Sequence, residues 1–132
     1  MKYACLGYIQ ETNLDAFTPA ARDAMKQECA AYCDTLRQNG HVLGGQALQT
    51  TRNAATLRWS GGRAAVTDGP FAETKEQLGG ILLLDATDLN HAIQLMANHP
   101  ALRRGFVTME IRPVEEVSHL DSLCETEAQW VK

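Results

Sequence analysis

The chain has 132 residues, of which 45% are apolar and 21% charged, and its formal net charge is −4. This composition is typical of a single globular domain and excludes an intrinsically disordered chain. The sequence has no Lys/Arg cluster for a nucleic-acid surface and no apolar run long enough to cross a membrane. No apolar signal segment precedes the first predicted strand, so we expect a cytoplasmic protein.

Strand and helix patterns alternate through the first 48 residues. Residues 2–9 are apolar at both parities and predict a strand. Thr18 is a good N-cap, and it is followed by Pro and by apolar residues at helical spacing as far as Gly40, which can end the helix. Residues 41–48 predict the second strand.

Gly61 and Gly62 form the two-residue turn of a predicted β-hairpin. With this turn, one face of the hairpin pairs Leu57 with Val66 and Trp59 with Ala64. The other face carries Thr56, Arg58, Ala65 and Thr67.

The second half of the chain repeats the strand–helix–strand order. The apolar run 79–86 predicts a central strand, and Asp88 can cap a helix that Pro100 ends. Alternation over residues 107–112 predicts the last strand.

Without the hairpin, this order is the split β-α-β arrangement of ferredoxin-like α+β domains. We assign residues 1–115 to that domain and residues 116–132 to a C-terminal extension.

Two helices cover only one face of a four-stranded sheet, whereas both predicted central strands are apolar on both faces. A face with Ala4, Leu6, Leu82 and Leu84, or with their alternates, would be a large exposed apolar patch. The hairpin could cover part of it, but a second copy of the sheet covers it more completely. We therefore predict a homodimer.

The segment from Val66 to Gly80, VTDGPFAETKEQLGG, resembles the signature of the DGPF group within the YCII-related family. Supporting matches are LGGQAL at residues 43–48 and MEIRPV at residues 109–114. The resemblance implies a dimeric α+β barrel made of two ferredoxin-like sheets, and it implies no settled reaction.

Some relatives in this group accompany or are fused to extracytoplasmic-function sigma factors. More distant YCII-related proteins carry a His/Asp pair, with the histidine on the first helix, and include a dehydrochlorinase of a chlorinated hydroquinone. The present sequence departs from that pattern, because residues 19–39 contain no His.

Asp68 is the first catalytic candidate. Pro70 stiffens its turn and would hold the carboxylate at a strand end near the sheet opening, where it could act as a general base. The structural alternative is that Asp at the first position of a β-turn bonds the backbone two residues on.

Lys75 is the second catalytic candidate, since a Lys among carboxylates could bind an anion or tune an acid. Such clusters are more often solvated surface. Arginine side chains of the hairpin could orient a carboxylate, and a tyrosine could supply a phenol. The predicted ligand-binding residues are Tyr8, Arg58, Arg63, Phe71 and Glu73.

Cys29 and Cys33 lie four residues apart on the first predicted helix and face the same way. We interpret them as a buried stripe of reduced thiols rather than as a metal pair. His99 precedes a Pro at a predicted helix C-terminus, where the helix dipole would favour a protonated imidazole. We predict no metal and no cofactor.

Two hypotheses of function follow. The first is a cofactor-independent enzyme (a lyase, an isomerase or a dehalogenase-like catalyst) acting on a small polar or anionic molecule between helices and sheet. Asp68 would be its base, and Arg63 or Lys75 would hold an anionic group. The second is a non-catalytic ligand-sensing or adaptor module associated with sigma-factor-dependent transcription, which rests on analogy alone. An enzyme should show a closed pocket with a carboxylate of raised pKa, and an adaptor an apolar patch outside the dimer interface.

Overall fold

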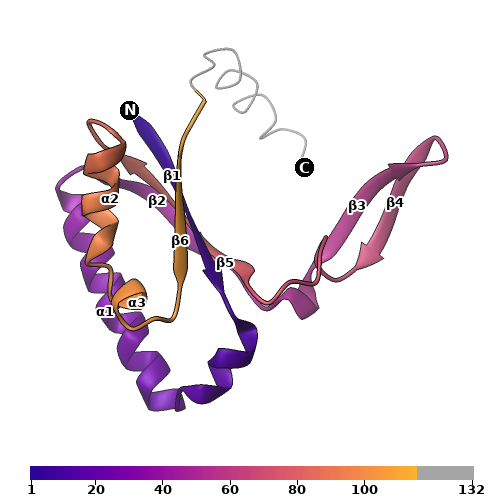
Figure 1. The fold of residues 1–132 in the computed structure, drawn as a ribbon, viewed down its shortest axis with the longest axis horizontal. Helices are drawn as coiled ribbons and strands as arrows, with labels where there is room; N and C mark the ends of the chain where they lie inside the picture. Colours follow the sequence, from indigo (N-terminus) through magenta and orange to yellow (C-terminus); the bar gives the residue numbers. More distant parts are fainter. Residues whose placement is uncertain (116–132) are drawn as a thin grey trace.

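A four-stranded antiparallel sheet carries helices on one face, and a separate two-stranded hairpin projects from one end of it (Figure 1). This computed structural model describes residues 1–115, apart from the side chains of Asn13 and Leu14. In chain order the elements are β1 (Lys2–Ile9), η1 (Glu11–Ala16), α1 (Pro19–Gln38), β2 (Val42–Ala47), η2 (Thr51–Asn53), β3 (Ala55–Ser60), β4 (Arg63–Asp68), β5 (Gln77–Asp85), α2 (Leu89–Ala97), α3 (Pro100–Arg103) and β6 (Thr108–Pro113).

The strand order in the main sheet is β2-β5-β1-β6, so the first and third strands of the split β-α-β pattern are central. This confirms the predicted α+β fold. The predicted extension of residues 116–132 lies outside the described residues. None of the helices within residues 1–115 is long and apolar enough to cross a membrane.

The helix starts follow from short polar side chains at the predicted positions. Thr18 caps α1 by accepting a hydrogen bond from the Ala21 amide at 3.1 Å. Asp88 caps α2 by accepting from the His91 amide at 2.8 Å. Each cap satisfies an amide that has no partner inside its helix.

The helix-facing side of the sheet holds the core. Tyr3 and Cys5 on β1 are buried there, and they pair with Leu84 and Leu82 on β5. Directly paired residues of antiparallel strands lie on the same face, so both leucines point toward the helices. The predicted grouping of these two leucines with Ala4 and Leu6 is therefore wrong.

The opposite side of the sheet carries the residues that alternate with these core residues along β1 and β5. Ala4 pairs with Leu83, and Leu6 pairs with Ile81, which is 37% exposed. We call these four residues the open face, because no helix within residues 1–115 covers them (Figure 1).

The hairpin has the predicted register, with Leu57 opposite Val66 and Trp59 opposite Ala64. We call residues 55–68 the arm. The arm forms its own two-stranded sheet and projects away from the main sheet (Figure 1), so it does not cover the open face of its own chain.

Candidate functional site

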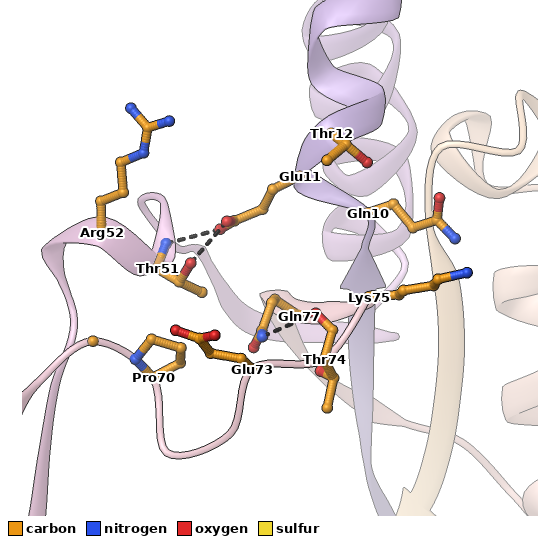
Figure 2. A pocket seen from close by; sticks show the side chains of 11 residues that line it. Gln10, Glu11, Thr12, Thr51, Arg52, Pro70, Glu73, Thr74, Lys75 and Gln77 are labelled. Atoms are coloured by element: carbon orange, nitrogen blue, oxygen red, sulfur yellow. Dashed lines mark hydrogen bonds between the residues drawn. The ribbon is translucent and has the colours of Figure 1, made fainter.

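Two cavities are candidates for a ligand site. The first, which we call the end pocket, lies between η1, η2 and the loop of residues 69–77 and has a volume of about 670 Å³ (Figure 2). Its walls are polar, and they include the predicted residues Glu73 and Lys75. Figure 2 shows these two side chains pointing apart, so they do not form an ion pair.

Glu11 is the best-fixed polar side chain of the end pocket. Its carboxylate accepts a hydrogen bond from the Thr51 amide at 2.8 Å and another from the Thr51 hydroxyl at 2.7 Å. These bonds, the amide bond first, lower the pKa of Glu11. Glu11 is thus an ionised tie between η1 and η2, and its lowered pKa does not fit the raised pKa expected of a catalytic carboxylate in a closed pocket.

Asp68 ends β4, opposite Ala55, and is exposed. It does not line the end pocket, whose wall begins at the next residue, Gly69. The residue two positions on is Pro70, which has no N–H to donate. The Asp68 carboxylate therefore cannot accept the backbone hydrogen bond that an aspartate at the start of a turn commonly makes with the residue two positions on. Its catalytic role stays a prediction.

The remaining predicted residues are divided between three places. Tyr8 lines an open surface hollow of about 570 Å³ together with Lys75. The Arg58 guanidinium lies 5.8 Å from the centre of the Phe71 ring and donates a hydrogen bond to the Phe71 carbonyl at 3.3 Å. Arg63 lies near the tip of the arm, opposite Ser60. The structure therefore brings some of these residues together in pairs but does not gather them in one site.

The second cavity, which we call the helix–sheet cavity, lies between α1, α3 and the helix-facing side of the sheet and has a volume of about 330 Å³. It occupies the position in which the first hypothesis places a substrate. Most of its wall is apolar, and its polar side chains include Cys33, Arg37 and His99.

His99 is buried, with 6% of its surface exposed, and both of its ring nitrogens have neighbours. Nδ1 accepts a hydrogen bond from the Ala101 amide at 3.2 Å and so caps α3. Nε2 lies 3.8 Å from the Cys33 sulfur. Because Nδ1 uses its lone pair, we assign the proton of the neutral ring to Nε2.

Burial lowers the pKa of His99. The predicted protonated imidazole at a helix C-terminus is therefore wrong: α2 ends at Ala97, and His99 begins the next helix as a neutral cap. An imidazolium would need a proton on Nδ1, which would face the Ala101 amide proton.

The two thiols that line the helix–sheet cavity with His99, those of Cys5 and Cys33, are neutral as well. Burial, and then the neighbouring Cys29, raises the pKa of Cys33, while burial raises that of Cys5 to about 11. Since Nε2 already carries a proton, His99 cannot take one from Cys33, and the pair does not form a nucleophilic dyad. Cys29 and Cys33 are half-buried rather than a fully buried stripe.

No set of three or more His, Cys, Asp and Glu side chains within residues 1–115 gathers in a way that could hold a metal ion. Sequence reasoning missed the contact between His99 and Cys33, because it joins segments 66 residues apart. The first helix carries no His of its own, and the structure brings one to it from the start of α3.

Comparison with known proteins gives a family and a fold. The sequence profile of the YCII-related domain matches residues 1–118. An uncharacterised protein of Rhizobium meliloti (strain 1021) is 33% identical over 114 residues, which cover 86% of this chain and 92% of that protein.

A solved structure has a similar fold, with a TM-score of 0.56 at 15% sequence identity over 90% of this chain and 98% of the other. It is the 5-chloro-2-hydroxyhydroquinone dehydrochlorinase of Burkholderia phenoliruptrix AC1100 in complex with 2,5-dihydroxybenzoquinone.

Proposed function

The chain belongs to the YCII-related family, and from that premise we propose that it binds a small oxygen-bearing ring compound in the helix–sheet cavity and promotes a cofactor-independent proton transfer or elimination there. The observation that carries this proposal is that the buried His99 lines a mostly apolar cavity while its Nδ1 accepts from the Ala101 amide, which leaves Nε2 as the donor of the neutral ring.

A fixed donor in apolar surroundings can stabilise negative charge that develops on a substrate oxygen. A neutral imidazole is suited to this, because it donates a hydrogen bond without bringing a buried charge; triosephosphate isomerase uses one in the same way. Among residues 1–115 the hydrogen-bond partner of Nε2 is the Cys33 sulfur at 3.8 Å, which is a weak acceptor. A ligand oxygen would be a stronger one.

Arg37 gives the cavity a cation for an anionic group on the ligand. Its guanidinium lines the cavity and also pairs with Asp34 at 2.9 Å. Both side chains are more than half exposed, so the pair is weak and a ligand anion could compete with Asp34.

The volume of the cavity favours a compact ligand, since about 330 Å³ is at the small end for ligand sites. The dehydrochlorinase of similar fold was solved with a dihydroxybenzoquinone, a ring compound with oxygen substituents. At 15% identity the likeness shows the fold alone, so it motivates the choice of probe and does not transfer the reaction.

The experiment is a titration with 2,5-dihydroxybenzoquinone, followed by its absorbance. We expect saturable binding of one molecule per chain, weakened about fivefold in His99→Ala, since a hydrogen bond contributes about 1 kcal/mol. His99→Asn is the sharper variant, because Asn can still cap α3 while it removes the imidazole donor.

Asp68→Asn serves as the control, because Asp68 lies outside the helix–sheet cavity. It should leave the affinity unchanged. If Asp68→Asn abolished binding and both His99 variants bound as tightly as the unmodified protein, the site would instead be centred on Asp68.

We further propose that the open face packs against the open face of a second copy. Three large apolar side chains, Leu6, Ile81 and Leu83, occupy it without cover from a helix within residues 1–115. Face-to-face packing of two sheets would bury them. The adaptor alternative has one observation in its favour, the apolar face of the arm, which no other element within residues 1–115 covers.

A further inference from the structure

The arm is an amphipathic ribbon whose apolar face is not covered by any other element within residues 1–115. Leu57, Trp59 and Val66 lie on that face and are 66%, 77% and 67% exposed. A two-stranded hairpin is at best marginally stable alone in water. A ribbon that presents a Trp and two aliphatic side chains to solvent therefore requires a partner surface.

The polar face of the arm is turned back toward its own chain. The Thr56 hydroxyl donates to the Gly69 carbonyl at 2.9 Å, and Arg58 donates to the Phe71 carbonyl at 3.3 Å. At the base of the arm, the Gly69 amide donates to the Ala54 carbonyl at 2.7 Å. These bonds fix the face that carries Thr56 and Arg58 against the loop that follows, so the apolar face points away from it.

We propose that the apolar face of the arm packs against a second copy of the chain and clasps the pair that the open faces form. The inference builds on the open-face pairing proposed above and does not depend on ligand binding. A stable interface buries about 800 Å² on each partner. Three side chains, with a Trp contributing at most about 250 Å², fall short of that area, so the arm needs a further surface on the same partner.

The open face supplies that further surface on the same chain. In a two-fold pair, each copy would offer its arm and its open face to the other, and both apolar surfaces would be covered by one symmetric interface. An arm that projects away from its own sheet (Figure 1) is placed to reach beyond its own subunit.

The fluorescence of Trp59 tests the proposal directly. The chain has two tryptophans, and Trp130→Phe leaves Trp59 as the only one. In this full-length variant we expect blue-shifted emission at high concentration that moves toward that of the denatured chain on dilution. The midpoint should coincide with dissociation measured by sedimentation.

Substitution on the two faces of the arm supplies the matched comparison. Trp59→Ala should raise the dimer dissociation constant by at least about thirtyfold, as truncation of a central aromatic anchor does. Thr67→Ala, on the polar face of the same strand pair, should leave it within about twofold.

Emission of a fully exposed Trp in a pair that still forms would overturn the clasp and leave the open-face pairing standing. Blue-shifted emission that does not depend on concentration, and that is lost when residues 116–132 are removed, would also overturn it, with that segment as the occupant. A monomer with exposed Trp59 at all concentrations would overturn both assembly proposals and favour a different partner protein. The probe titration of the helix–sheet cavity would be unaffected by any of these outcomes.

Discussion

The two ring nitrogens of His99 have different roles, and this difference decides how the residue responds to pH. Nδ1 accepts from the Ala101 amide, and Nε2 faces Cys33, which lines the helix–sheet cavity together with His99. Protonation would disrupt the cap and place a charge in an apolar wall. The same arrangement that makes His99 a neutral donor therefore also makes it an acid-sensitive element of the fold.

His99→Asn should flatten the pH dependence of stability as pH falls below the ordinary histidine pKa of 6.5. In the unfolded chain the imidazole titrates near its ordinary value of 6.5, and burial lowers the pKa in the folded chain. Between the two values the unfolded chain binds more protons, so stability falls as pH falls. One proton contributes a slope of at most about 1.4 kcal/mol per pH unit.

Urea unfolding of the unmodified chain and of His99→Asn at several pH values measures the difference. The other three histidines are common to both proteins and cancel in the comparison. If the free energy of unfolding changed with pH in the same way in both proteins, the assignment of His99 as a buried neutral imidazole would be contradicted.

At the scale of the elements, Glu11 fixes η1 to η2. η1 follows β1 and η2 follows β2 in the chain. The Glu11 carboxylate joins them by accepting hydrogen bonds from the amide and the hydroxyl of Thr51. They form two walls of the end pocket (Figure 2). Loss of the carboxylate would leave the half-buried Thr51 amide without its partner.

Glu11→Ala should lower the free energy of unfolding by about 1 to 2 kcal/mol, toward the low end for hydrogen bonds to a charged group, because solvent screens a carboxylate near the surface. Glu73→Ala, in the same pocket, is the control and should change it by less than about 0.5 kcal/mol. Chemical unfolding near pH 7 gives both values. The Glu11 contribution should be present above the ordinary Glu pKa of 4.5 and be lost as pH falls through the lowered pKa of the folded chain. Equal effects of the two substitutions would argue that the Glu11–Thr51 hydrogen bonds do not stabilise the contact between η1 and η2.

The elements themselves were predictable because their signals are local. Thr18 and Asp88 cap the helices that follow them, and the two glycines at 61 and 62 set the register of the hairpin. The face assignment of β5 was not predictable, because a continuously apolar strand such as residues 79–86 gives no alternation to read.

Most of the candidate site could not be predicted from the sequence, because its contacts join residues far apart in the chain. Glu11 meets Thr51 across 40 residues, and Cys33 meets His99 across 66. No spacing rule connects residues so far apart on different elements. Asp68, Lys75 and Arg63 were chosen for their chemistry and nearness in sequence, and the structure does not gather them around one cavity.

On the scale of the whole molecule, the uncovered side of the sheet has the most direct consequence. Leu6→Lys should prevent pairing, raising the dimer dissociation constant by about a hundredfold or more, because an unpaired charge would be buried in the interface. In the separated subunit the same Lys would lie in solvent, so the fold should persist.

Sedimentation velocity measures the oligomer, and circular dichroism checks the fold of the separated subunit. Gln27→Lys adds the same charge on an exposed position of α1 and should leave pairing unchanged. Equal sedimentation of Leu6→Lys and the unmodified chain would contradict open-face pairing.

The register of β5 against β1 shifts by one residue beside Gly79: Gly7 pairs with Gly80, but Tyr8 pairs with Leu78. Because side chains alternate between the two faces of a strand, the extra residue reverses the faces to which Gln77 and Leu78 point. Gln77, which holds the Ala72 and Thr74 carbonyls, owes its orientation to this bulge. Shortening β5 by that one glycine would turn the Gln77 side chain to the other face of the sheet and so break its hold on the connection of residues 69–76 that joins the arm to β5.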